Sequence, residues 1–251
     1  MIRALLLFLA IAVPGRAEEI VADLSQDRVS ISTNFDGSEI LIFGAIRRDA
    51  PRSFDSKMSI VITVEGPRED VTVRRKNRVL GIWVNADSVE MENVPSFYAV
   101  ASSRPLAEAL SAEEDLRWRI TTRRALTAPE RMRLARWEPQ FLNALVRVNT
   151  AAGAYTTSED GVDLREGTLF STSIALPASL TEGNYTTRIY LTRDGRVTDS
   201  HATALYVQKV GLERFLYVLA HEQPLIYGCL SLLIAIAAGW GASAIFRYTR
   251  L

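Results

Sequence analysis

The side chains with the clearest chemical potential in this sequence form a short basic run. Arg74, Arg75, Lys76 and Arg78 stand close together, and Trp83 follows them. Four cationic groups attract an anion at low ionic strength, and added salt weakens that attraction. Two interpretations are open. The run contacts an anionic lipid headgroup, an anionic solute or an acidic partner, or it is a solvated hairpin tip.

The role of Trp83 depends on the face of the strand to which it points. Neighbouring residues of a strand point to opposite faces, so Ile82 and Val84 share one face and Trp83 takes the other. An exposed Trp83 beside Arg75 and Arg78 would mark a contact surface. We expect the alternative, in which Trp83 is buried under a helical segment as part of the core.

The residues after this strand are expected to form a polar connection and then another strand. Residues 85–93 supply the connection, and Pro95 limits pairing at the start of the next strand. Phe97 and Tyr98 are neighbours on that strand. We therefore expect at most one of these two rings to lie in the core.

No arrangement typical of catalysis or cofactor binding is present. His201 follows Asp199 and Ser200, but neighbours on a strand cannot form a catalytic triad by themselves. The only cysteine, Cys229, lies in an apolar segment, and no pair of histidines has metal-ligand spacing. We predict a protein that is not an enzyme, without catalytic residues, bound metal or cofactor.

The two ends of the chain carry apolar segments of different length. Residues 1–17 have the layout of a secretory signal peptide, with a short apolar run after Arg3 and small residues at the cleavage site. Residues 224–246 contain no charged side chain. They are long enough to cross a bilayer as a helix, which needs about 20 residues.

These segments predict a single topology. Arginines in the tail at 247–251 follow the span, and the positive-inside bias places them in the cytoplasm of a bacterial inner membrane. The bulk of the chain then lies in the periplasm. Residues 211–223 are expected to form a juxtamembrane helix that lies along the interface or extends the span. The lipid bilayer is therefore one predicted partner.

The membrane span also carries small residues at regular spacing. Ala235, Gly239 and Ser243 are four positions apart, a pattern that lets a second helix approach closely. We leave open whether this face packs against another protein or against lipid alone. Nucleic acid is excluded as a partner, because 29 basic residues balance 29 acidic ones and leave no basic footprint.

Residues 18–103 show the pattern of short strands joined by turns. Residues 29–33 and 40–46 flank Asp36-Gly37, a dipeptide that tight hairpins favour. The nearly continuous apolar run at 40–46 predicts a strand that is buried on both faces. This pattern predicts a β-sandwich.

Two further stretches of this region have distinct patterns. Residues 58–66 alternate cleanly between the two faces of a strand, and residues 71–85 are expected to form two short strands around a polar turn.

The exported part is about 200 residues long, so it can bury a core without disulfides.

Residues 104–153 change to a helical pattern. Ser111 with Glu114 and Thr127 with Glu130 each fit a capping box. An apolar face recurs at helical spacing and is expected to pack on the sandwich; it comprises Leu134, Trp137, Phe141, Leu145 and Val148. Pro139 predicts a kink or a junction of two helices near Glu138.

Strands resume in a second β region at 154–210, with an Asp194-Gly195 hairpin turn. Whether this region is separate or completes the first sandwich stays open. We predict a mainly β fold: an immunoglobulin-like β-sandwich ectodomain with a helical segment, and one C-terminal transmembrane helix.

Several segments of the sequence resemble sequences of the alphaproteobacterial transmembrane protein family. The resemblance rests on NFDGSEILIFGAI, VEGPREDVTVRRKNRVLGIWVNADSVEMENVPSFYAVASSRPL, LFSTSIALPASLTEGNYTTRIYLTRDG and the closing QPLIYG and GWGASAIFR. It implies a membrane-anchored protein and supplies no catalytic residue. It also implies an accessory role beside a permease that resembles sulfite or sulfonate exporters.

These observations favour a membrane-anchored periplasmic accessory or binding protein that acts with an integral-membrane partner such as an anion permease. The alternative is a structural or envelope protein that associates with itself and has no transporter partner.

Overall fold

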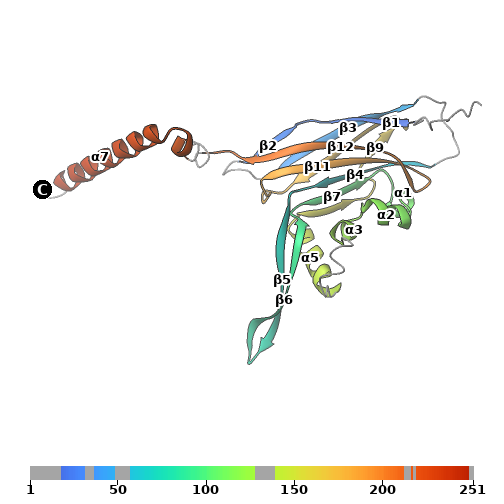
Figure 1. The fold of residues 1–251 in the computed structure, drawn as a ribbon, viewed down its shortest axis with the longest axis horizontal. Coiled ribbons are helices and arrows are strands. Elements are labelled where there is room, and N and C mark those ends of the chain that lie inside the picture. Colours follow the sequence, from blue (N-terminus) through green and yellow to red (C-terminus); the bar gives the residue numbers. More distant parts are fainter. Residues whose placement is uncertain are drawn as a thin grey trace, which may run out of the picture.

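The computed structural model describes residues 18–31, 37–48, 57–127, 139–211, 216 and 219–248. The predicted signal peptide lies outside these residues, as does most of the predicted tail. The described chain forms two packed β-sheets, a layer of helices, a projecting hairpin and a C-terminal apolar helix (Figure 1). The predicted mainly β fold with one C-terminal helix is confirmed.

The smaller sheet, sheet A, has four strands in the order β1-β3-β10-β9. All pairs within it are antiparallel. Its strands are β1 (Glu18–Leu24), β3 (Ser38–Arg48), β10 (Leu169–Leu176) and β9 (Asp163–Arg165).

The larger sheet, sheet B, has six strands in the order β2-β12-β11-β4-β7-β8. Its two outermost pairs, β2 with β12 and β7 with β8, are parallel, and the others are antiparallel. Its strands are β2 (Arg28–Ile31), β12 (Arg196–Lys209), β11 (Gly183–Arg193), β4 (Met58–Glu65), β7 (Tyr98–Ser102) and β8 (Tyr155–Ser158).

The strand order corresponds to that of immunoglobulin-type sandwiches. There, strands A, B, E and D form one sheet and strands C, F and G form the other. Here β1, β3, β10 and β9 take the first set of positions, and β4, β11 and β12 take the second. Tyr185 lies near the start of β11, and its hydroxyl donates a hydrogen bond to the Thr181 carbonyl at 2.9 Å. This is the geometry of a tyrosine corner, which marks the start of strand F.

The strands of residues 154–210 complete the same sandwich. Strand β10 pairs with β3, and β11 pairs with β4, so the late strands insert between or beside the early ones. The Asp194-Gly195 hairpin forms as predicted, with φ angles of 50° and 79° in the two turn residues. By contrast, the hairpin predicted at Asp36-Gly37 does not join its flanking strands. Strand β2 pairs with β12, whereas β3 pairs with β1 and β10.

Strand β4 is buried along its whole length. Ile60 and Ile62 pack between the two sheets, and Val61 packs on the opposite face together with residues of the helical layer. The clean alternation predicted for 58–66 is therefore misleading, because both faces of the strand are covered. For the same reason, Phe97 and Tyr98 are both buried, one in each core, and the expectation of a single buried ring is wrong.

Strand β3 shows the opposite departure from its prediction. Ile40, Ile42 and Ile46 are buried, whereas Leu41 and Phe43 are exposed. The apolar run at 40–46 is thus buried on one face only. The reason is that no described element covers the outer face of sheet A.

The helices cover the face of sheet B that points away from sheet A (Figure 1). They are α1 (Leu106–Ala109), α2 (Ala112–Trp118), α3 (Thr122–Leu126) and α5 (Pro139–Ala151). Ser111 caps α2 as predicted, since its Oγ accepts a hydrogen bond from the Glu114 amide at 3.3 Å. Phe141 and Leu145 are buried against the sandwich, whereas Val148 is exposed. Glu130, Leu134, Trp137 and Glu138 lie outside the described residues.

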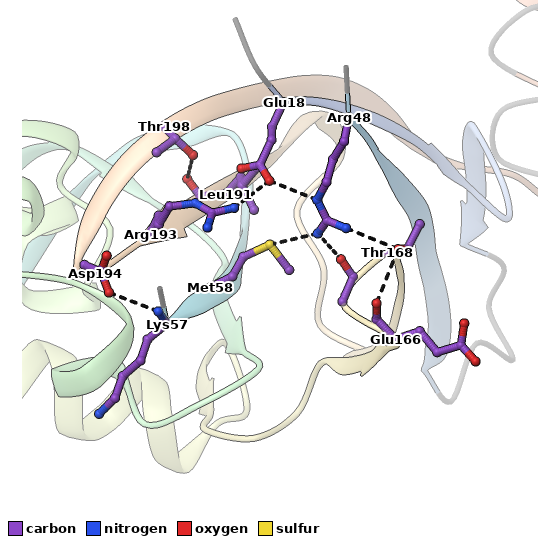
Figure 2. A network of polar contacts seen from close by, with 11 residues as sticks. Glu18, Arg48, Lys57, Met58, Glu166, Thr168, Leu191, Arg193, Asp194 and Thr198 are labelled. Atoms are coloured by element: carbon purple, nitrogen blue, oxygen red, sulfur yellow. Dashed lines mark hydrogen bonds and ion pairs between the residues drawn. The ribbon is translucent and has the colours of Figure 1, made fainter. Parts of the chain in front are cut away.

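A cluster of ionic groups joins the two sheets at the start of β1 (Figure 2). Glu18 accepts hydrogen bonds from Arg48 of β3 at 2.9 Å and from Arg193 of β11 at 2.6 Å. Arg48 also contacts the Met58 sulfur at 3.2 Å and donates to the Gly167 carbonyl. These contacts fix one end of the sandwich, opposite the end from which the projecting hairpin leaves.

The C-terminal helix α7 (Pro224–Tyr248) stands apart from the sandwich. Its segment Pro224–Ser243 is long and apolar enough to cross a membrane, and none of it is buried against the rest of the chain. The predicted juxtamembrane helix at 211–223 is described only in part, and residues 219–222 of it are helical.

Alkaline unfolding should reveal the buried tyrosines of both cores. Burial raises the pKa of Tyr155 and of Tyr185 to about 12, from the usual value of 10.0. Between these pH values the unfolded chain releases phenolic protons that the folded chain retains. Stability should therefore fall as the pH rises from 10 to 12, by about 2 kcal/mol per residue. Ultraviolet difference spectroscopy should show these two tyrosines ionising only with unfolding. Their ionisation in the still-folded protein near pH 10 would contradict this.

Candidate functional site

A long β-hairpin, here called the arm, leaves sheet B and ends away from the sandwich (Figure 1). Its strands are β5 (Arg68–Val79) and β6 (Ile82–Pro95). Twelve residues of extended strand reach about 40 Å. The sequence predicted two short strands and a polar connection at 85–93, but that connection belongs to the continuous strand β6. The two strands pair only with each other, so the arm is a separate ribbon.

The root of the arm is packed against the helical layer. Met91 and Val94 of β6 are fully buried, and Val73 and Val89 are half-buried against the same core. These residues meet α5 through side chains such as Phe141. The proximal part of the arm is therefore part of the folded body.

Arg75 belongs to this packed part, although the sequence grouped it with the other cations. Its guanidinium donates to the Asp87 carboxylate at 2.9 Å and to the Gln140 side chain at 3.3 Å. It also lies over the Phe141 ring, 6.0 Å from the centroid. Arg75 thus ties the arm to α5, whereas the guanidinium of Arg78 only donates to the Gly81 carbonyl in the nearby turn, at 3.4 Å.

The remaining cations form one face of the distal arm. Strand alternation places Arg74, Lys76 and Arg78 on the same side of β5. Trp83 is paired across the ribbon with Arg78, so the indole lies beside the last guanidinium. Within the described chain, neither Arg74 nor Lys76 has an acidic partner. The structure thus places three of the predicted cations on one face of a strand and not in the turn, and their role as an anion or partner contact stays a prediction.

The end of the arm is apolar. Its turn, Leu80-Gly81, has φ angles of 50° and 90°, the conformation of a two-residue hairpin turn. Gly81 adopts it without strain, whereas Leu80 carries a Cβ into the left-handed region. Leu80 is 99% exposed and Trp83 is 68% exposed. The expected burial of Trp83 is thus wrong, because the ribbon extends past the helices that would cover it. We call Val79, Leu80, Ile82 and Trp83 the apolar tip.

The structure also brings together residues that the sequence patterns did not single out. A cavity of about 390 Å³ lies where the arm root, the helix-covered face of sheet B and helix α2 meet. Glu65 of β4 accepts hydrogen bonds there from Arg68 and Arg188, both at 2.6 Å. We call this cavity the arginine pocket, after Arg68, Arg117, Arg119 and Arg188, which line it. Glu65 and Arg188 are 123 positions apart, so no spacing in the sequence predicts their contact.

The predicted small-residue face of the membrane span lies on α7. Ala235, Gly239 and Ser243 are exposed and four residues apart on one side of the helix. A Cβ added to Gly239 would meet no atom of the chain within 4 Å. The described part of the protein therefore supplies no packing partner for this face.

Residues 19–248 match the model of a protein family that is described as "Putative transmembrane protein (Alph_Pro_TM)". The chain belongs to this family. The match covers the sandwich, the arm and all of α7, and the family and the apolar helix together fit a single-pass membrane protein. No curated protein matches the chain.

Because the root of the arm is packed and its tip is exposed, we predict that side-chain truncation destabilises the protein strongly at the root and hardly at the tip. Met91→Ala removes a fully buried side chain and should lower the free energy of unfolding by about 2–5 kcal/mol. Trp83→Ala should change it by less than about 0.5 kcal/mol, because the ring is mostly exposed. Urea unfolding of both variants in detergent measures the contrast. Equal destabilisation would show that the tip is packed in solution.

Proposed function

We propose that this protein is a membrane-anchored accessory protein that docks its arm on an integral-membrane partner. Helix α7 holds the chain in the bacterial inner membrane, with the sandwich in the periplasm and the C-terminus in the cytoplasm. In this proposal the protein acts by binding and not by catalysis. The resemblance noted above suggests an anion permease as the partner.

The observation that carries the proposal is the composition of the distal arm. A cationic face with Arg74, Lys76 and Arg78 adjoins an exposed Trp83 at the end of a long ribbon. Exposed aromatic and apolar side chains next to arginines are typical of the centres of protein interfaces. An acidic surface complements this face, and electrostatic attraction then guides the encounter.

The place of the arm in the fold supports a partner in the same membrane. The arm begins at Pro67, whose ring packs against Gly183 of β11, 3.1 Å from the position of an added Cβ. Gly183 pairs with Val207, near the end of β12. The arm and the chain segment that leads to α7 thus leave the sandwich at the same end. An arm of about 40 Å can reach a protein that lies beside the anchor.

A photo-crosslinking residue at position 83, in the full-length protein in its native membrane, tests the proposal. The expected product is a cross-link to one membrane-embedded protein with acidic periplasmic loops. The same photo-crosslinker at position 43 is the matched control, because Phe43 is also an exposed ring but lies on sheet A. It should give no such product.

Charge reversal on the cationic face provides a second test of the proposal. The triple change Arg74→Glu, Lys76→Glu and Arg78→Glu should reduce the cross-link about tenfold or more. Reversal of Arg165, an exposed arginine of β9, should leave it intact. Cross-links to lipid alone, or a product that survives the triple change, would overturn the proposal.

The alternative is self-association through the membrane span. It is favoured by the uncovered face with Ala235, Gly239 and Ser243 on α7. Gly239→Ile should then abolish a dimer that is detected by cross-linking at low protein-to-detergent ratio, with Gly241→Ile, on the opposite side of the helix, as the control. A wild-type protein that is monomeric under these conditions contradicts the alternative.

A further inference from the structure

We infer that the arginine pocket binds a small organic oxyanion that carries a ring. The site is distinct from the apolar tip, and it would give the protein a soluble ligand in addition to a membrane partner. Its chemistry is set by the charge, the rigidity and the aromatic lining of the cavity, and each of these comes from different elements of the fold.

The charge of the pocket is strongly positive. Arg68 from the arm root, Arg188 from β11, and Arg117 and Arg119 from the end of α2 line the cavity, against the single carboxylate of Glu65. Within the described chain, the Arg119 side chain has no carboxylate partner. Arg117 lies 3.8 Å from Glu114 but is 73% exposed, so this pair is weak. The pocket therefore has positive charge in excess of what its own acids neutralise.

Glu65 orients two of these arginines before any ligand arrives. Its carboxylate is almost buried, and each of its oxygens is used by a different guanidinium. Burial alone would lower the pKa of Arg188, but the hydrogen bond and the charge of Glu65 raise it. Both guanidiniums stay charged and keep further N–H groups for an incoming acceptor. A planar, forked donor of this kind matches the oxygens of carboxylate, sulfonate or phosphate groups.

The rest of the lining combines three aromatic rings, which favour a ring in the ligand, with Ala125 and with Ser200, His201 and Ala202 of β12. Trp118 packs edge-on against Tyr190, with centroids 5.6 Å apart. The indole N–H is already donated to Glu114 at 2.9 Å, which fixes the ring in place. Tyr98 forms part of the inner wall, and its hydroxyl donates to the Ile120 carbonyl at 2.8 Å. These rings present faces and edges to the cavity, beside the polar side chains of Ser200 and His201.

The size of the cavity distinguishes an organic anion from an inorganic one. A volume of about 390 Å³ falls in the range of small-molecule sites, which is roughly 300–1,000 Å³. Inorganic phosphate would satisfy the guanidiniums but leave the aromatic wall uncovered. An aromatic oxyanion satisfies both parts of the pocket at once.

Isothermal titration of the full-length protein in detergent tests the inference, with benzoate, benzenesulfonate and phenyl phosphate as probes. At least one probe should bind saturably, about tenfold or more tighter than benzyl alcohol, which lacks the charge, and inorganic phosphate, which lacks the ring. The absence of saturable binding by all three probes would overturn the inference. Equal binding of phosphate and phenyl phosphate would overturn the aromatic part of it.

Two variants assign the binding to the pocket. Arg117→Gln removes a charge from an exposed rim position, so the fold is retained, and it should weaken binding several-fold. Arg119→Gln removes a second charge that no carboxylate of the described chain neutralises, and it should also weaken binding several-fold, with the fold checked by circular dichroism. Arg165→Gln, outside the pocket on β9, is the matched control and should have no effect. An unchanged affinity in both Arg117→Gln and Arg119→Gln contradicts the site.

This inference and the proposed function can fail independently. The charge-reversed arm should bind the probe normally, because Arg74, Lys76 and Arg78 do not line the pocket. Conversely, Arg117→Gln should leave the cross-link from position 83 unchanged.

Discussion

The covering of strand β4 on both faces is the constraint on which the rest of the structure depends. Met58–Glu65 is buried on each side. Its apolar face packs in the core between the two sheets, and its mixed face, with Ser59, Val61, Thr63 and Glu65, lies under a second layer. The residues between β7 and β8 supply that layer as helices. At the end of β4 the chain must leave the double core, and Gly66 allows a close turn, since a Cβ there would lie 2.9 Å from the Tyr185 ring. The arm and the arginine pocket both begin at this exit.

The parts of the fold that the sequence predicted well are those with local causes. The Asp194-Gly195 turn depends on two adjacent residues that tolerate positive φ angles, and the Ser111 cap on a hydroxyl three residues before an amide. Helix α7 follows from an uninterrupted apolar run. In each case the residues that form the feature are neighbours in the chain, so the pattern is visible without knowledge of any distant contact.

The features that the sequence did not predict depend on which element covers which face. Alternation says that Phe97 and Tyr98 point apart, but only the presence of a third layer makes both of them buried. Trp83 is a large aromatic residue of the kind that cores favour, but it is exposed because the ribbon extends past the helices that would cover it. Arg75 and its neighbour Arg74 look alike in sequence, yet one is tied to α5 and the other is not. In the pocket, Glu65 and Arg188 meet because β4 and β11 are paired, and no local sequence pattern predicts which strands pair.

The segment between β12 and α7 has a consequence for how strong the contacts of the arm need to be. Fourteen residues, 210–223, span at most about 50 Å, so the sandwich stays within about that distance of α7. A partner beside α7 would meet the apolar tip at an effective concentration in the millimolar range, as for other short tethers. An interface too weak to persist in solution would then be largely occupied at the membrane. In the proposed docking, a small exposed cluster of four apolar residues would be sufficient, and the contact would stay readily reversible.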